Sequence, residues 1–492
     1  MSILANQRTH PDTALQEKLD YSRKDSDLYC NSNRPSFKKL TLNLKKFSSL
    51  VELNLEWCRL KSLPEVSLDR LRTLNISSNF FRTIPDVVFK WTSLEVIVAS
   101  QNRMDSLPNR FSELASLRVL DLGATTINEL PPSLQNHEKL EVLDLGENGL
   151  VLTIDSFNLA NPLLKKVEFF DNDLSEVPSC IWNLKNIERL SFCCNKITTI
   201  VGLEKVKTLR SLDINENPIA EFKEITKLTQ LHCLKVALRT EEEQDFDFSC
   251  LSQLRTLKID GEINKSRVSA DISDLEVLRC RFTGLKEMPK ISTAKKLKKL
   301  DLRGNKISYI ANGFVQFTLL QELNFRFNKL SSFPESAKFD NLIMADFSYN
   351  EFEEVPSFIF SCKNLEKLNL DRNTIQSIPD LISTLEKLKV FRMAGNRVSE
   401  VSENLFKLVN LEELTIAGNR IEFLPDKFEV FKTMKKLSLS NNKLTEFPAS
   451  IVNMKMLHET DFSGNPFKVE PDLSRFKERK IKVSQVGRSV LM

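Results

Sequence analysis

Residues 378–398 read IPDLISTLEKLKVFRMAGNRV: an apolar residue followed by proline, apolar residues three apart, and an alternating apolar stretch that ends at Asn396. The same pattern recurs along the chain, with first apolar positions 21 to 24 residues apart. Such self-similarity is typical of stacked repeats. The sequence therefore predicts one array over residues 50–468, in place of the roughly three domains that its length alone would suggest. The nineteen first positions are Leu50, Leu71, Leu94, Leu117, Leu140, Leu164, Ile187, Leu209, Leu231, Leu254, Leu275, Leu297, Leu320, Leu342, Leu365, Leu388, Leu411, Met434 and Leu457.

Each repeat predicts a short strand, because apolar residues alternate with other residues over L-x-x-L-x-L. The apolar side chains would point into a core, and the residues between them would point out. A single repeat of about 23 residues cannot bury its own apolar face, so the units must stack. We therefore expect an α/β solenoid, a curved horseshoe with a parallel β-sheet on the concave face and short helices or turns on the convex face.

An asparagine follows the strand in fourteen repeats, where the chain turns inward. Its side-chain amide can bond backbone groups of neighbouring turns that would otherwise be buried without partners. Cys58, Thr125 and Thr283 replace it with small donors, whereas Arg239 and Glu262 cannot be buried cheaply, so we expect the ladder to be interrupted there. The asparagines are residues 79, 102, 148, 172, 195, 217, 305, 328, 350, 373, 396, 419, 442 and 465.

Eleven repeats continue with an apolar residue and a proline, as at Ile378-Pro379. Proline suits an early helical position. Apolar residues follow at three-residue spacing, which predicts the buried face of a short convex-side helix or turn.

The two ends of the array should differ from its repeats. We expect a mobile polar tail over residues 1–36, with at most a weak helix around 13–21, and an N-terminal cap over residues 37–49. A basic cap and tail over residues 469–492 should close the other end, covering it with Phe467, Val469, Leu473, Phe476, Ile481 and Val483. This tail is compatible with peripheral contact to acidic lipid, although most such tails are simply solvated.

Composition excludes several functional classes. Lys and Arg number 70 against 66 Asp and Glu, and this near-neutral balance gives no reason to expect a nucleic-acid partner. Nine cysteines without any C-x-x-C spacing indicate reduced cytosolic thiols and neither a disulfide framework nor a zinc site. The N-terminus does not have the pattern of a signal peptide, and no run of 18 apolar residues predicts a transmembrane segment.

The string from Ile378 through Asn396 to Val398 resembles the intracellular leucine-rich repeats of Ras-signalling scaffolds. Similar repeats occur in plant Ras-group proteins, basolateral polarity scaffolds and leucine-rich-repeat phosphatases. The resemblance covers about residues 37–468 and implies a curved binding platform in cytoplasmic signalling. The 27 residues after Asn465 leave no room for an appended catalytic domain.

The strand residues expected on the concave face lie 2, 4, 6 and 7 positions after each first apolar residue. They are mainly acidic from the repeat at Leu117 to the one at Leu209, with only Lys166 and Arg189 opposing, and mainly basic from Leu231 to Leu320, against Asp260, Asp301 and Glu322. Aromatic residues interleave them and, like arginine, are common at binding hot spots. The candidate protein-binding residues are Asp121, Asp144, Glu147, Glu168, Phe170, Asp171, Asp213, Glu216, Lys235, Lys258, Arg279, Arg281, Phe282, Arg303, Arg326, Phe327 and Tyr349.

Two alternatives stay open at this point. The concave charges could merely pair across neighbouring repeats and keep the array soluble. The repeats over 231–285, which lack the Asn and Pro markers, form either a hinge with a second contact or a degenerate pair with a solvated acidic loop at residues 241–247. Their spacing of 21 to 23 residues excludes an inserted domain.

No constellation for catalysis is present in the sequence. His137 takes a convex position that is apolar in most repeats, and no P-loop, H-E-x-x-H or G-x-S-x-G occurs. Cys193 and Cys194 are best interpreted as small strand-face residues. The stretch Lys166 to Phe169 fits a phosphatase 1 ligand motif, but Val167 and Phe169 are inward strand positions. The C-terminal residues 490–492 match a PDZ ligand only weakly.

The sequence thus predicts a non-catalytic cytoplasmic scaffold or adaptor in signal transduction that binds protein partners without a cofactor. The resemblance implies a Ras-like small GTPase or a phosphatase subunit as the partner. The alternative is the regulatory, substrate-recruiting part of a phosphatase or ubiquitin-ligase assembly whose catalytic unit lies elsewhere.

Overall fold

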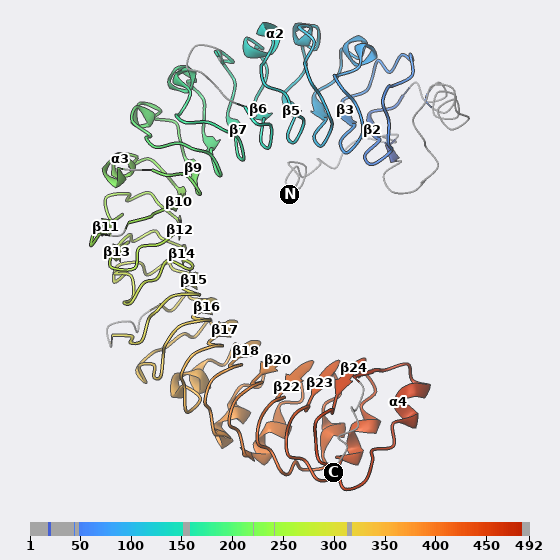
Figure 1. Ribbon diagram of the computed structural model, residues 1–492, viewed down its shortest axis with the longest axis vertical. Helices are drawn as coiled ribbons and strands as arrows, with labels where there is room; N and C mark the ends of the chain where they lie inside the picture. The colour runs from blue at the N-terminus through green and yellow to red at the C-terminus, as the bar shows by residue number, and fades with distance from the viewer. Residues whose placement is uncertain are drawn as a thin grey trace. The chain divides into compact units, whose positions relative to one another are not determined.

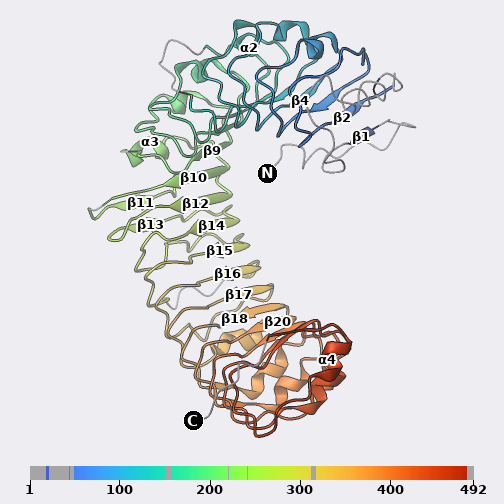
Figure 2. The same ribbon diagram turned by 45° about the vertical axis from the view of Figure 1, so that its right-hand side comes forward.

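The computed structural model describes residues 18–20, 44, 49–150, 158–219, 221–240, 242–311 and 317–484. The chain divides into two compact units, residues 1–231 and 232–492. Within each unit, parallel strands line one face, the strand face, and short helices and turns form the opposite face (Figures 1 and 2). Each unit is therefore built as the repeat pattern predicts.

Every one of the nineteen predicted repeats contains a strand, which begins two residues after its first apolar position. In the first unit these are β2 Glu52–Asn54, β3 Thr73–Asn75, β4 Val96–Val98, β5 Val119–Asp121, β6 Val142–Asp144, β7 Lys166–Glu168, β8 Arg189–Ser191 and β9 Ser211–Ile214. In the second they are β10 Cys233–Ala237, β12 Thr256–Asp260, β14 Val277–Cys280, β15 Lys299–Asp301, β16 Glu322–Asn324, β17 Met344–Asp346, β18 Lys367–Asn369, β20 Val390–Arg392, β22 Glu413–Thr415, β23 Lys436–Ser438 and β24 Glu459–Asp461.

The core of each unit lies between its two faces. The predicted inward strand residues are buried, and equivalent phenylalanines of adjacent repeats stack just after the strands. The ring centroids of Phe169 and Phe192 lie 5.4 Å apart, and those of Phe325 and Phe347 lie 5.9 Å apart. Because each ring contacts its counterpart one repeat away, burial depends on stacking and not on any single repeat.

Most helices on the opposite face are 3-10 helices. The sequence predicted either short helices or turns there. Proline is the N-cap residue of several, and the backbone N–H groups bond three residues back, as Val88 does to the Pro85 carbonyl at 3.0 Å. Three to five residues suffice for this tighter turn. The helices are η2 Asp86–Lys90, η3 Phe111–Glu113, α2 Pro132–Gln135, η4 Ser179–Asn183, η5 Leu203–Lys205, α3 Phe222–Thr226, η6 Ser357–Ser361, η7 Asp380–Thr384, η8 Glu403–Lys407, η9 Phe428–Val430, η10 Ala449–Asn453 and α4 Ser474–Glu478.

The predicted asparagine ladder is confirmed. Asn350 is typical: its Nδ2 donates to the carbonyls of Phe325 at 2.9 Å and Phe347 at 3.0 Å, and its Oδ1 accepts from the Leu330 N–H at 3.0 Å. One side chain thus satisfies backbone groups of its own repeat and of the preceding one. This bonding explains why an amide, which both donates and accepts, recurs at the position.

The residues that replace asparagine in the ladder are buried or exposed according to their size and charge. Cys58, Thr125 and Thr283 are buried in the asparagine slot, and Thr125 donates to the Leu122 carbonyl at 2.8 Å. Arg239 and Glu262 are exposed instead, so the ladder is interrupted in those two repeats as expected.

A second set of asparagines, which the sequence analysis missed, ties the turns that precede the strands. Asn186, Asn341, Asn364 and Asn410 each stand one residue before the first apolar position. Each donates from Nδ2 to a carbonyl one repeat back, at 2.7 to 2.9 Å. These side chains are exposed, so the bonds compete with water and contribute less than those of the buried ladder.

The irregular repeats are built differently on the helical face. Short strands β11 Asp245–Asp247 and β13 Arg267–Ser269 pair in parallel there, in place of helices. The acidic stretch predicted as a solvated loop is thus partly a strand, because Phe246 alternates inward between Asp245 and Asp247 and is buried. A smaller pair joins β19 Ser377–Ile378 to β21 Glu400–Val401.

The ends of the array depart from some expectations. At Lys18–Asp20 the chain forms strand β1, which pairs with β2, and not the weak helix suggested by the sequence. At the other end Phe476 of α4 and Ile481 are buried, and β25 Lys482–Ser484 extends the sheet beside β24, whereas Val469 is exposed and covers nothing. The other residues of the tail over 1–36, most of the N-terminal cap, and residues 485–492 lie outside the described residues.

The ladder generates a stability prediction. Asn350→Ala leaves the buried Leu330 N–H without a partner, at about 1–3 kcal/mol, and removes two further amide hydrogen bonds, including one of the two that the Phe325 carbonyl accepts. We expect urea unfolding to report a loss of about 3 kcal/mol. Asn410→Ala, which breaks one exposed bond, is the control and should lose about 1 kcal/mol or less. Equal losses in the two variants would contradict the assigned role of the buried ladder.

Candidate functional site

The first unit gathers carboxylates on its strand face. The strand register places Asp121 directly beside Asp144, and Asp144 directly beside Glu168. Adjacent strands lie about 4.8 Å apart, and like charges at such positions are destabilising. Lys166 offsets part of this repulsion through an ion pair with Glu168 at 2.6 Å.

Asp144 is buried, which corrects its prediction as an exposed strand residue; Asp301 of the second unit is buried likewise. The Asp144 carboxylate lies between neighbouring strands and accepts from the Gly146 N–H at 3.0 Å. Burial, with a smaller contribution from the nearby Asp121 and Glu168, raises the pKa of Asp144 to about 7, against the hydrogen bond from Gly146. Burial also raises the pKa of Asp121.

The remaining acidic residues of the first unit reach solvent. Glu147, Asp171 and Glu216 are exposed, and Asp213 is half-buried. Phe170 is also half-buried, because its ring lies on Gly146: a Cβ there would be 2.2 Å from the ring. This glycine is therefore required by a close contact, and Phe170 is held in place on the face.

The second unit carries cations in the equivalent row. Lys235 lies beside Lys258, and Lys258 beside Arg279, in register on β10, β12 and β14. Three like charges in succession are a cost to folding that solubility does not require. Elsewhere on this face opposite charges do pair: Arg281 contacts Asp301 at 2.6 Å, and Lys299 contacts Glu322 at 2.6 Å. Pairing across repeats therefore explains some of the charges on this face.

Three arginines and three aromatic residues form what we call the arginine–aromatic ridge: Arg281, Arg303, Arg326, Phe282, Phe327 and Tyr349. The Arg326 guanidinium lies 4.7 Å from the Phe327 ring centroid and 4.8 Å from that of Tyr349, and these two rings stack at 4.1 Å. Arg303 lies over Phe282 at 5.5 Å. Cation–π contacts of this kind hold the arginines in place without neutralising them.

The aromatic residues of the ridge are exposed in a backbone conformation that favours glycine. Phe282, Phe327 and Tyr349 are 58, 40 and 37% exposed and have φ of 53, 56 and 57°. The same position, seven after the first apolar residue, is glycine in some repeats, such as Gly304, and a small or polar residue in most others, such as Glu147, also with positive φ. Non-glycine residues pay roughly 1–2 kcal/mol in this conformation. The fold alone therefore gives no reason for three large exposed rings here.

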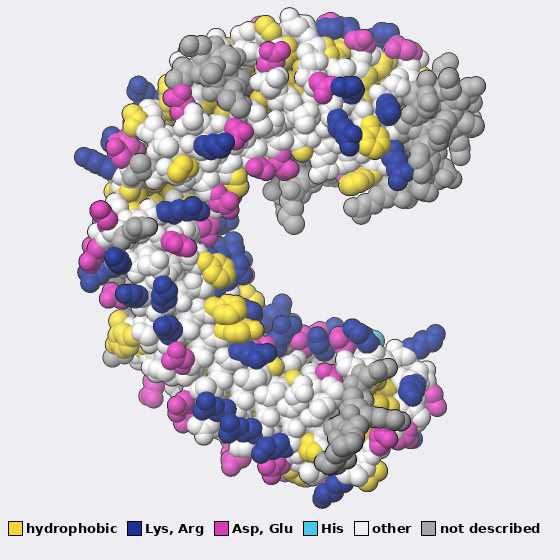
Figure 3. All heavy atoms as spheres, viewed as in Figure 1, with side chains coloured by type: hydrophobic (Ala, Val, Ile, Leu, Met, Phe, Trp, Pro, Cys, Tyr) yellow, Lys and Arg dark blue, Asp and Glu magenta, His cyan; other side chains and the backbone are white. Residues whose placement is uncertain are grey.

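The space-filling view places this feature among the elements. Figure 3 shows hydrophobic side chains gathered beside Lys and Arg side chains at the strand edge, over β14 to β17. Large exposed apolar groups next to arginines are the combination that protein interfaces favour.

The candidates for reaction chemistry are structural. Cys193 and Cys194 have sulfurs 3.3 Å apart, but burial raises the pKa of both thiols, which opposes thiolate formation. His137 is buried, contacts the Leu114 carbonyl at 3.1 Å, and has its pKa lowered by burial. Val167 and Phe169 are in the core, so the phosphatase-ligand motif they resemble is not displayed.

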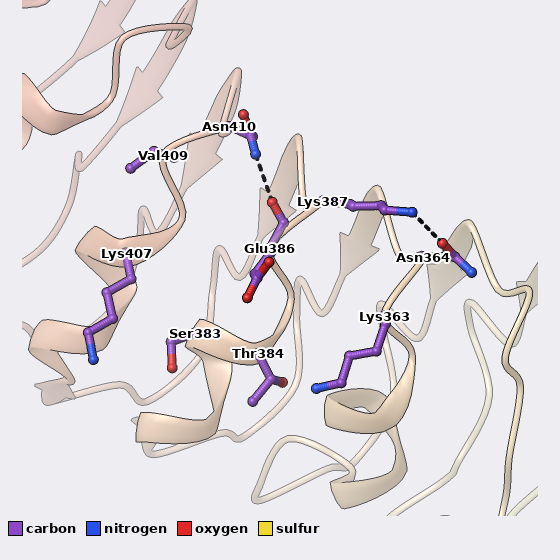
Figure 4. A pocket seen from close by; sticks show the side chains of 9 residues that line it. All are labelled: Lys363, Asn364, Ser383, Thr384, Glu386, Lys387, Lys407, Val409 and Asn410. Carbon is purple, nitrogen blue, oxygen red and sulfur yellow. Dashed lines mark hydrogen bonds between the residues drawn. The ribbon is translucent and has the colours of Figure 1, made fainter.

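A hollow on the helical face of the second unit is lined by three lysines, Lys363, Lys387 and Lys407, with Ser383 and Thr384 between Lys407 and Lys363 (Figure 4). Lys387 donates to Asn364 at 2.6 Å, and Asn410 bonds the Glu386 carbonyl at 2.9 Å. These contacts belong to the turns between repeats, so the hollow follows from the stacking of the repeats.

Two further searches cover only the described part of the chain. There, no three His, Cys, Asp or Glu side chains are arranged to hold a metal ion. Nor does any helix in that part have the length and apolar character needed to cross a bilayer.

Comparisons with known proteins agree with the repeat fold. Models of leucine-rich repeats match residues 69–127, 293–309, 364–385 and 433–454. The structure is similar to that of a leucine-rich repeat protein of Leptospira interrogans. The match covers 93% of this chain and 99% of that chain, with TM-score 0.51 and 22% identity. The Arabidopsis receptor kinase HAESA ectodomain, solved with a peptide hormone, matches 90% of this chain and 78% of its own, with TM-score 0.52 and 24% identity. The chain is thus a leucine-rich repeat solenoid.

Similar sequences belong to proteins of diverse function. The human volume-regulated anion channel subunit LRRC8A is 23% identical over 226 residues, which are 44% of this chain and 23% of the channel subunit. The Arabidopsis homolog of the protein phosphatase 1 regulatory inhibitor subunit PPP1R7 is 31% identical over 132 residues, 26% of this chain and 39% of that protein. The matched stretches thus span less than half of either relative.

The buried carboxylate of Asp144 makes stability depend on pH. Its folded pKa of about 7 exceeds the ordinary aspartate value near 4, so folding favours the proton-bound form. The stability that the proton-bound Asp144 contributes is therefore fully present below about pH 4 and is lost as the pH rises through 7. Asp144→Asn cannot ionise, and we expect its stability relative to the unaltered chain to rise by a few kcal/mol between pH 4 and pH 8.

Chemical denaturation across this pH range measures the effect. The exposed Asp171→Asn, which removes a carboxylate from the same face, serves as the control for the substitution itself. A stability difference for Asp144→Asn that does not change with pH would refute the raised pKa.

Proposed function

We propose that this protein is a non-catalytic scaffold or adaptor in intracellular signal transduction that docks partner proteins on the strand faces of its units. The observation that carries the proposal is the arginine–aromatic ridge. Its rings are large and exposed in left-handed positions that most other repeats fill with glycine or with small or polar residues. A binding surface explains why such residues are retained, because aromatic and arginine side chains supply most interface energy.

The like-charge rows support the same proposal. Asp121, Asp144 and Glu168 in one unit, and Lys235, Lys258 and Arg279 in the other, repel their neighbours in register. A partner of opposite charge would relieve that repulsion and gain specificity and association rate from it. The acidic row of the first unit would then select a basic surface, and the cationic row of the second unit would select an acidic surface.

A second candidate function has one observation in its favour. The similarity to a phosphatase 1 regulatory inhibitor subunit supports a regulatory role in a phosphatase assembly whose catalytic unit is a separate chain. A Ras-like partner and a cytoplasmic location rest on the sequence resemblance alone.

Affinity purification with quantitative mass spectrometry tests the proposal. The variant Arg279→Glu, Arg281→Glu, Arg303→Glu and Arg326→Glu reverses the strand face of the second unit. We expect the partners captured by the unaltered chain to fall at least about tenfold, as charge reversal at a hot spot should cost more than about 1.4 kcal/mol.

The control reverses the same number of cations on the helical face, at Lys363, Lys387, Lys407 and Lys432, and should retain capture. Equal capture by both variants would place binding elsewhere and end the proposal. Recovery of a phosphatase catalytic subunit that depends on the strand face would favour the second candidate function.

A further inference from the structure

A hollow opens beside the ridge where the asparagine ladder is interrupted. It lies within the second unit and is lined by Arg239, Gly261, Glu262, Lys265 and Phe282, among others. In regular repeats a buried asparagine side chain bonds this turn to its neighbours, but Arg239 and Glu262 are exposed, and the turns are joined here by backbone bonds such as that from the Thr240 N–H to the Glu262 carbonyl at 3.0 Å. The hollow therefore lies at the two repeats before Phe282 whose slot holds no asparagine side chain.

The walls of this hollow are fixed by close contacts. Gly261 has φ +99°, and a Cβ there would lie 2.2 Å from the Leu238 carbonyl oxygen. Asn264, another lining residue, accepts from Lys306 Nζ at 2.7 Å, and a Cβ on Gly284 would lie 2.0 Å from its Oδ1. Only glycines permit this packing, so the hollow is a defined feature of the second unit.

The cations around the hollow outnumber its one acid. Arg239 and Lys265 line it opposite Glu262, and Phe282 forms its apolar wall and is 58% exposed. The Phe282 ring also packs against Gly304 of the next repeat, where a Cβ would lie 2.2 Å from the ring. Phe282 therefore links the hollow to the ridge.

The neighbouring arginines are held ready for an anion. Arg303 is stacked on Phe282, and its Nε is buried with no hydrogen-bond partner among the described atoms. Arg326 is stacked on Phe327 and Tyr349. Neither guanidinium forms an ion pair with a carboxylate in the part of the chain that the structure describes. Arginines fixed by aromatic faces lose little entropy when they bind a carboxylate.

We propose that the hollow and the ridge together bind a short acidic segment of a partner protein. One apolar side chain of the segment enters the hollow against Phe282, and its carboxylates contact Arg303 and Arg326. The proposal rests on the proposed function and names the chemistry of its partner.

A discrete acidic peptide fits the charges better than a nucleic acid. Asp301, Glu322 and Asp346 lie on strands β15, β16 and β17, between and beside the arginines of the ridge. A backbone with a phosphate at every nucleotide would pass close to these carboxylates. A peptide with a few acidic residues can place its charges on the arginines alone.

Fluorescence anisotropy on the full chain tests the inference. The probe is a short fluorescein-labelled peptide in which Asp and Glu flank one central leucine. We expect Arg303→Glu with Arg326→Glu to weaken binding at least about tenfold, while Arg303→Lys with Arg326→Lys loses less because charge is kept. Arg420→Glu, an exposed arginine away from the ridge, should bind as the unaltered chain does.

A double-mutant cycle assigns the hollow. Replacing the leucine of the probe with serine should weaken binding to the unaltered chain but not weaken it further in Phe282→Ala. Additive losses would overturn the placement of the apolar side chain. Unfolding midpoints of all variants separate lost binding from lost folding.

Other outcomes overturn the proposal in distinguishable ways. Tighter binding of a labelled oligouridine, lost in the same glutamate variants, would assign the site to nucleic acid. Self-association of the chain that the glutamate variants abolish would assign it to a second copy. No binding of the acidic probe, with partner capture still dependent on the strand face, would reject this inference and leave the proposed function standing.

Discussion

The structure depends on one constraint. In every repeat the backbone turns inward into a core without water, so each buried N–H and carbonyl group there needs a hydrogen-bond partner within the protein. The buried asparagines meet this constraint. Asn350 bonds two repeats at once, as do its counterparts. Because an amide donates and accepts from one planar group, it joins consecutive turns in a way that no single apolar residue can.

Where that constraint is relaxed, the surface changes. At Arg239 and Glu262 the slot holds no amide, the strands are longer, and the helical face is made by β11 and β13. The hollow beside Phe282 opens at the same two repeats. An irregularity that first reads as a degenerate pair of repeats thus shapes the surface next to the most exposed aromatic residue of the ridge.

The near-neutral composition of the chain conceals ordered rows of charge. Parallel register turns a repeat of 21 to 24 residues into rows of equivalent side chains on adjacent strands. In the first unit such a row is acidic enough for burial and repulsion to raise the pKa of Asp144 to about 7. In the second unit arginines stay charged against aromatic rings. The rows of like charge and the left-handed backbone beneath the exposed rings cost folding energy, which supports the proposed binding role.

The sequence by itself determined the repeats, the position of the strand in each of the nineteen repeats, the asparagine ladder and the residues that the strand face carries. Each of these follows from a periodicity of one or two residue types, and local periodicity is visible in a single chain. Only the tertiary structure decided which strand-face residues are buried, as at Asp144, and which rings lie on glycines, as Phe282 does on Gly304. It also decided the stacking of Arg326 on two rings and the hollow beside Arg239. These depend on contacts between residues a full repeat apart, and the geometry of such contacts exists only once the repeats have stacked.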